Sequence, residues 1–350
     1  MLPHACVAAV ARLWLIILTC TSSVLASAGD QAEFFQRQCI PACLDFFKGG
    51  PECDIPLLFR LARWTCTDEC KYQCMRVITD NAIRDREPIL QYYGKWPFVR
   101  YAGMQEPASV AFSVMNLIAH LYGARLVSRR VPNDHPMRRY YLNWAYVSIN
   151  AWFWSSVFHT RDIPWTERLD YFSAASAIMY ALYSVLVRIF HLYAGPNSRP
   201  TSSPSPSHSS PAAPALKPLA ITCFIVYIGH VTYLSILPRF DYTYNMAFNL
   251  GLGLTHNILW IIYSLPSSRS LLPRFPFRPK DYRPAFVNKA FVFVLLTTAA
   301  TALELFDFPP WLFVIDAHAL WHLSTVPITK LWYDFLVEDA LDDGWRVQKS

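Results

Sequence analysis

The stretch WLFVIDAHALWHLSTVPITKLWYD, residues 311–334, decides how this chain folds. It is mostly apolar and as long as the run of roughly 20 residues that a helix needs to cross a bilayer. Within it His318 and His322 stand four residues apart, so in a helix both side chains project from one face. Ionisable groups are costly inside a membrane, and two converging histidines suggest a metal ligand pair. The stretch therefore predicts a transmembrane helix that carries part of a functional site.

The rest of the chain has the same apolar character. Of its 350 residues 53% are hydrophobic and only 16% are charged, well below the roughly 25% charge of soluble domains. Six further apolar segments have lengths that suit a spanning helix. We therefore predict an all-α membrane protein, a bundle of seven transmembrane helices at residues 107–127, 140–159, 169–192, 218–237, 243–264, 287–305 and 311–334.

Basic residues gather in two of the loops between these segments. The net charge is +6, but this distribution reports membrane orientation and gives no support to a nucleic-acid partner. The first and fifth loops are expected to be cytosolic, as is a Pro/Ser-rich linker at 195–217, which we expect to be disordered. The cytosolic tail is placed at 340–350. The two basic loops carry Arg125, Arg129, Arg130, Arg138 and Arg139, and Arg269, Arg274, Arg278, Lys280 and Arg283.

The first residues resemble a secretory signal. Arg12 precedes an apolar run from Leu13 to Leu18, and the small residues Ala26, Ser27 and Ala28 follow. This order predicts a cleaved signal peptide at residues 1–28. A first transmembrane helix is the alternative, but the apolar run is shorter than a span needs. A signal peptide places the domain that follows in the lumen, in agreement with the loop charges.

Six cysteines crowd into the segment after the signal. An even, dense set in an oxidising compartment predicts three disulfides in a small luminal domain at residues 29–100. A zinc module built on the CxxxCxxxC spacing is the alternative, and the sequence leaves all pairings open. The seven-helix domain then covers 101–339. The six residues are Cys39, Cys43, Cys53, Cys66, Cys70 and Cys74.

A second polar group accompanies the histidine pair. Ser155 and His159 are four residues apart near the end of the second apolar segment, and Asp170 opens the third. With the expected topology, these residues and the two late histidines all lie within roughly 16 Å of the luminal surface, at about 1.5 Å per helical residue. Residues from three helices thus share one depth, which predicts a common site.

The residue types in this group fit zinc-dependent hydrolysis. Catalytic zinc takes three protein ligands and leaves a fourth position to water, and we assign His159, His318 and His322 as ligands. Bound zinc lowers the pKa of water to about 7. Asp170 is predicted to move the proton of that water, and Ser155 to donate a hydrogen bond to the developing oxyanion. The predicted reaction is hydrolysis of an ester or amide.

Several alternatives stay open at this stage. Ser156 is also close to His159 on a helix and could replace Ser155. Asp170 could cap its helix or hold a ligand histidine in place. A Ser155, His159 and Asp170 triad would explain hydrolysis without metal, but it leaves the two late histidines unexplained. Glu106 is interpreted as a charge favoured by the first helical turn or as a luminal contact.

These motifs, taken together, resemble a known superfamily. Serine and histidine four apart, an aspartate eleven further on and a late HxxxH look like the CREST seven-helix membrane hydrolases, which include alkaline ceramidases. The stretches WTCTDECKYQCM (64–75), GKWPFVR (94–100) and QEPASVAFSVMN (105–116) resemble more closely the PER-like, post-GPI-attachment lipid-remodelling factors within that superfamily. The resemblance runs from about Cys39 to Asp339.

The resemblance implies a specific activity. Such a protein would remove the unsaturated sn-2 acyl chain from the phosphatidylinositol of glycosylphosphatidylinositol (GPI)-anchored proteins, a phospholipase A2-type reaction. It implies a zinc cofactor, GPI-anchored proteins and membrane lipid as partners, and residence in the endoplasmic reticulum membrane or possibly the Golgi. A ceramidase-like amidase and a non-catalytic receptor or chaperone with structural zinc are the alternatives. The oligomeric state is left open.

Overall fold

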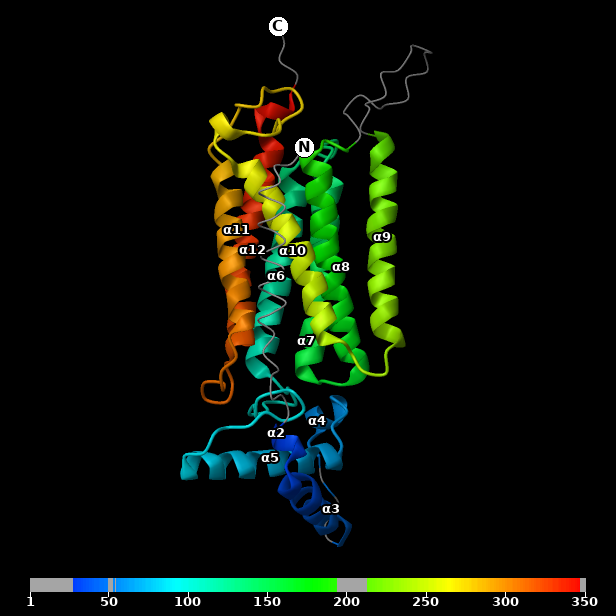
Figure 1. Ribbon diagram of the computed structural model, residues 1–350, viewed down its shortest axis with the longest axis vertical. Coiled ribbons are helices and arrows are strands. Elements are labelled where there is room, and N and C mark those ends of the chain that lie inside the picture. The colour runs from blue at the N-terminus through cyan, green and yellow to red at the C-terminus, as the bar shows by residue number, and fades with distance from the viewer. Residues whose placement is uncertain (1–27, 50–52, 54, 194–212, 347–350) are drawn as a thin grey trace. The chain divides into compact units, whose positions relative to one another are not determined.

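The computed structural model describes residues 28–49, 53, 55–193 and 213–346, and in these residues the secondary structure is helical, with no strand. Seven long helices run side by side in the second part of the chain (Figure 1). The signal peptide expected at 1–28 lies outside the described residues except for Ala28. The seven helices are α6 (Pro107–Arg130), α7 (Arg138–Thr160), α8 (Pro164–Ile189), α9 (Ala213–Ile236), α10 (Tyr242–Ser264), α11 (Val287–Leu305) and α12 (Ala317–Leu341).

Helix starts follow local chemistry. Both α6 and α8 begin with a proline, which is tolerated there because the first helical N–H has no partner within the helix. The carboxylate of Asp316 caps α12 by accepting a hydrogen bond from the Ala319 N–H at 2.8 Å. Asp241 caps α10 in the same way. Residue identity therefore determines where these helices begin.

The expected segment at 311–334 is displaced in the structure. Residues 311–316 are not helical, and Leu312 and Phe313 have positive φ angles of 54° and 59°. At its other end α12 continues to Leu341, and Asp339 and Ala340 are buried. The helix thus runs two residues past residue 339, where the bundle was expected to end. The last five residues of the linker expected at 195–217 are also helical, because α9 begins at Ala213.

Three of the described helices are long and apolar enough to cross a membrane, which supports the expectation of a membrane protein. They are Pro107–Arg130, Pro164–Ile189 and Pro214–Ile236, and a shorter apolar helix covers Val287–Leu303. The number of spans, seven, stays a prediction.

The chain forms two compact units. The first contains the residues up to Gly103 together with Pro309–Phe313, and the second contains the seven long helices. In the first unit, disulfides Cys39–Cys74 and Cys43–Cys70 tie α3 (Ile40–Gly49) and the π-helix Phe34–Cys39 to α5 (Cys66–Asp85). Three bridges were expected, and the described residues form two. The Sγ of Cys66 lies 3.8 Å from the backbone carbonyl oxygen of Cys53.

Close packing of α6 and α12 requires a glycine. A Cβ atom added at Gly123 of α6 would lie 2.1 Å from the buried ring of Tyr333 on α12. The hydroxyl of Tyr333 is itself hydrogen-bonded to Nδ1 of His120 at 2.9 Å. Because α12 carries His318 and His322, this contact helps to set the position of both histidines against α6.

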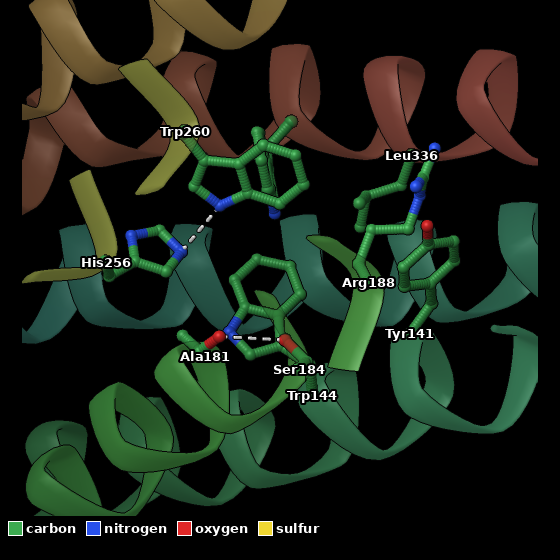
Figure 2. Close-up of a pocket in the computed structure, with 9 residues that line it drawn as sticks. Tyr141, Trp144, Ala181, Ser184, Arg188, His256, Trp260 and Leu336 are labelled. Carbon is green, nitrogen blue, oxygen red and sulfur yellow. Dashed lines mark hydrogen bonds between the residues drawn. The ribbon is translucent and has the colours of Figure 1, made fainter. Parts of the chain in front are cut away.

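A buried ion pair joins four helices at the other end of the bundle. The carboxylate of Asp339 on α12 accepts two hydrogen bonds from Arg188 on α8, at 2.6 and 2.8 Å. It also accepts hydrogen bonds from the hydroxyls of Tyr141 on α7 and Tyr263 on α10. A small cavity adjoins this network, and Figure 2 shows Arg188 and His256 in its lining. Along α12, Asp339 is about 25 Å from His322 at 1.5 Å per residue.

Candidate metal centre

Three histidines from two helices converge near one end of the bundle. Nε2 of His318 lies 3.3 Å from Nε2 of His159 and 3.0 Å from Nε2 of His322. Two nitrogen ligands held about 2.0–2.1 Å from one tetrahedral zinc would be about 3.3 Å apart. His159 and His322 are buried and His318 is partly buried. The spacing and the donor type therefore fit a single zinc ion, as the sequence predicts.

The outward nitrogens of two of these rings are held by α6. Nδ1 of His159 lies 2.8 Å from the Glu106 carboxylate, and Nδ1 of His322 lies 2.8 Å from the hydroxyl of Ser113. A ring that donates its Nδ1–H to a carboxylate presents the lone pair of Nε2 to a metal. Glu106, 4% exposed, is therefore placed to favour the tautomer of His159 whose Nε2 is available to a metal.

The residues on α6 are those that sequence reasoning missed. The sequence predicts a first-turn charge or a luminal contact for Glu106 and gives no role to Ser113. A signal was present, because Glu106 directly precedes the helix that carries Ser113, and the two are seven residues, or about two helical turns, apart. Asn116 extends the same face and donates a hydrogen bond to the backbone carbonyl of His322 at 2.7 Å.

The structure distinguishes the two candidate serines. The hydroxyl of Ser155 is buried and lies 3.0 Å from the hydroxyl of Ser113, which itself contacts His322. The hydroxyl of Ser156 instead donates a hydrogen bond to the carbonyl of Trp152, one turn back in its own helix, at 2.8 Å. Ser155 is thus joined to the histidine cluster through Ser113, and Ser156 satisfies its hydroxyl within α7.

Asp170 and Asp316 differ in position. Because α8 begins at Pro164, Asp170 lies in its second turn and cannot cap it. Asp170 is partly buried. Among the described residues, the three histidines form a group whose possible ligand atoms all lie within 4.8 Å of one another, and Asp170 is not part of that group. Asp316 caps α12, two residues before His318. The catalytic role of Asp170 stays a prediction.

The arrangement has the donor set of a metal centre. Three histidines leave one position of a tetrahedral ion for water or substrate. His159 is next to the last residue of α7 and His318 is the second residue of α12, so the cluster is close to the helix ends. Buried serine and glutamate side chains surround it. Such a site can polarise a carbonyl group and activate water at the edge of an apolar bundle.

Comparison with known proteins identifies the relatives of the chain. A family model for Per1-like proteins matches residues 56–340. A PER1 homolog of Schizosaccharomyces pombe is 38% identical over 332 residues, which is 91% of this chain and 89% of the relative. The proteins named GPI-specific phospholipase A2-like PGAP3 of Homo sapiens and Bos taurus are 36% and 37% identical, each over 93% of this chain and 94% of the relative. No solved structure matches.

Proposed function

Because the chain belongs to the Per1-like family, we propose that it remodels GPI anchors by hydrolysing an acyl ester of their lipid. Relatives that cover nearly the whole chain are named GPI-specific phospholipase A2-like. The observation that carries the proposal is the convergence of three histidine Nε2 atoms at separations of 3.0 and 3.3 Å. The bond proposed to break is the sn-2 ester of the anchor's phosphatidylinositol.

His159, His318 and His322 would hold one zinc ion, which when bound supplies a Lewis acid for water and the ester carbonyl. Glu106 keeps a proton on Nδ1 of His159 and so keeps Nε2 available as a ligand. Ser155 is proposed to donate its hydroxyl hydrogen to the carbonyl oxygen as negative charge develops there.

Proton transfer is assigned to Asp170. Its carboxylate would accept the proton of the attacking water and return it to the glycerol oxygen as the ester bond breaks. The products are a free fatty acid and a lyso form of the anchor lipid. A buried site near the helix ends suits an ester that lies just below the lipid headgroup.

The proposed substrates and location in the cell follow from the proposed hydrolysis of the anchor lipid. The substrates would be GPI-anchored proteins with their lipid moiety in the luminal leaflet. The protein would therefore reside in the membrane of the endoplasmic reticulum or the Golgi, with the histidine cluster towards the lumen. The basic loops between the helices support this orientation.

Zinc analysis combined with lipid profiling tests the proposal. Wild type and the His318→Ala variant are purified for zinc content, and each is expressed in cells that lack the endogenous protein. We expect about one zinc per wild-type chain and none in the variant, whose cells should retain unsaturated sn-2 chains on their GPI anchors. A Glu338→Gln variant, altered at a partly exposed ion pair with Lys289, serves as the control and should match wild type.

Two results would contradict the proposal. One is loss of zinc without any change in the anchor lipids, which would favour a non-catalytic role. The other is an accumulation of ceramide rather than of unsaturated anchors in the variant, which would favour an amidase.

A further inference from the structure

The first unit exposes apolar side chains in two places. On the short helix α4 (Leu57–Leu61), Leu57, Leu58 and Leu61 are 64%, 55% and 71% exposed. In the turn at Pro309–Phe313, Trp311 and Leu312 are 60% and 89% exposed. Side chains of this size gathered on a surface mark a site of contact with a partner or a membrane. We call these five residues the apolar rim.

Short chain connections tie the rim to helix ends. Three residues separate Gly103 from Pro107, the first residue of α6, and three separate Phe313 from Ala317, the first residue of α12. At no more than about 3.6 Å per residue, each connection reaches at most about 14 Å. Because α6 is long and apolar enough to span, Gly103 is held close to the membrane boundary. The turn at Pro309–Phe313 is held close to the first residue of α12.

Contacts within the unit bring α4 to the same connection. A Cβ atom added at Gly103 would lie 3.0 Å from the backbone oxygen of Leu58. The indole N–H of Trp64, which follows α4, donates a hydrogen bond to the carbonyl of Gly103 at 2.9 Å. The α4 part of the rim thus lies beside Gly103, which leads into α6. The other part belongs to the turn that leads into α12.

The charges beside α4 identify the chemistry of the partner. Residues 55–65, IPLLFRLARWT, contain Arg60 and Arg63 and no acidic residue. Both arginines are exposed. Guanidinium groups bind phosphates in a two-pronged geometry, leucines favour the acyl boundary, and tryptophan is enriched at membrane interfaces. This combination matches a phospholipid surface.

We propose that the apolar rim seats the first unit in the leaflet on its own side of the membrane. The leucines of α4, Trp311 and Leu312 insert at the boundary between headgroups and acyl chains, and Arg60 and Arg63 bind lipid phosphates. A partner protein is the less favoured occupant, because the connections keep Gly103 and Phe313 within about 14 Å of the first residues of α6 and α12 and the charges beside α4 are basic. The inference does not depend on hydrolysis or on zinc.

Site-specific photo-crosslinking of the full chain tests this inference. Benzoylphenylalanine is introduced singly at Leu61, at Leu312 and, as the control, at Phe46, which is 67% exposed on α3. Each chain is reconstituted into vesicles of phosphatidylcholine and phosphatidylserine, irradiated and analysed by mass spectrometry. We expect at least a tenfold higher yield of lipid adduct at Leu61 and Leu312 than at Phe46.

Equal yields at all three positions would overturn the proposal, because they would report chance encounters with lipid. Adducts to protein at Leu61 and Leu312, in place of lipid adducts, would also overturn it and would favour a docking surface for another chain. Both outcomes are independent of activity, so they are distinguishable from a failure of the proposed function.

Discussion

Glu106 controls the chemistry of a residue 53 positions away. Its carboxylate lies 2.8 Å from Nδ1 of His159, and its own backbone N–H donates a hydrogen bond to the carbonyl of the same histidine at 3.0 Å. One residue therefore fixes both the backbone and the ring of a proposed zinc ligand. The ring orientation and the tautomer follow from these two contacts.

Replacing Glu106 by glutamine is expected to weaken zinc binding by about 10–100-fold, since a carboxylate that orients a ligand histidine typically contributes that much. Glutamine keeps the shape of the side chain and removes its charge. Competition with a zinc-binding dye measures the affinity. The Glu338→Gln variant is the matched control, because Glu338 is a partly exposed residue paired with Lys289. Unchanged zinc affinity in a folded Glu106→Gln protein would contradict the assignment.

The neighbouring serines give a second prediction at this scale. Ser155→Ala is expected to lower kcat by about 10²–10³-fold, the usual loss when one donor to an oxyanion is removed, while zinc content stays unchanged. Ser156→Ala is expected to stay within about twofold of wild type, because its hydroxyl donates a hydrogen bond to the carbonyl of Trp152 in its own helix. Rates measured on a labelled GPI lipid separate the two. Equal losses in both variants would remove Ser155 from the proposed mechanism.

At the scale of helices, the sequence pattern located the seven long helices, but it misplaced both ends of the last one. Apolar runs in the sequence predicted these helices, and in six of them the predicted ends lie within about five residues of the observed ones. The last one is displaced because Asp316 caps it and positive φ angles at Leu312 and Phe313 keep the preceding residues in a turn. A hydropathy pattern does not distinguish an apolar turn from the first turn of a helix.

The ion pair of Asp339 and Arg188 gives the prediction for helix packing. Asp339→Asn is expected to lower the free energy of unfolding by about 3–5 kcal/mol, because it leaves a fully buried guanidinium without its counter-charge. The control is Asp343→Asn, just past the end of the same helix, whose pair with Arg346 is solvent-exposed and is worth about 0–1 kcal/mol. Denaturant titration in detergent micelles measures both. A change below 1 kcal/mol in Asp339→Asn, roughly a surface-pair value, would contradict this account.

Over the whole molecule, the sequence predicted which histidines come together, but it did not predict the side chains that contact them. His159, His318 and His322 could be grouped because helical spacing and a common depth brought them together. The spacing of Glu106 and Ser113 relates them to each other, but it does not give their partners, because these lie on other helices and depend on how α6 packs against α7 and α12. The cysteine pairings were likewise open, because connectivity depends on the path of the chain between α3 and α5.

The most direct test of the central claim is the release of labelled fatty acid by the purified chain. The substrate is a GPI-linked phosphatidylinositol with a labelled unsaturated sn-2 chain in vesicles. Protein as isolated, protein stripped of metal, stripped protein with zinc restored, and His322→Ala are compared. The account predicts labelled acid and the lyso lipid only from the native and zinc-restored wild-type protein. Release that persists after zinc removal or in His322→Ala, or no release from protein with full zinc content, would contradict it.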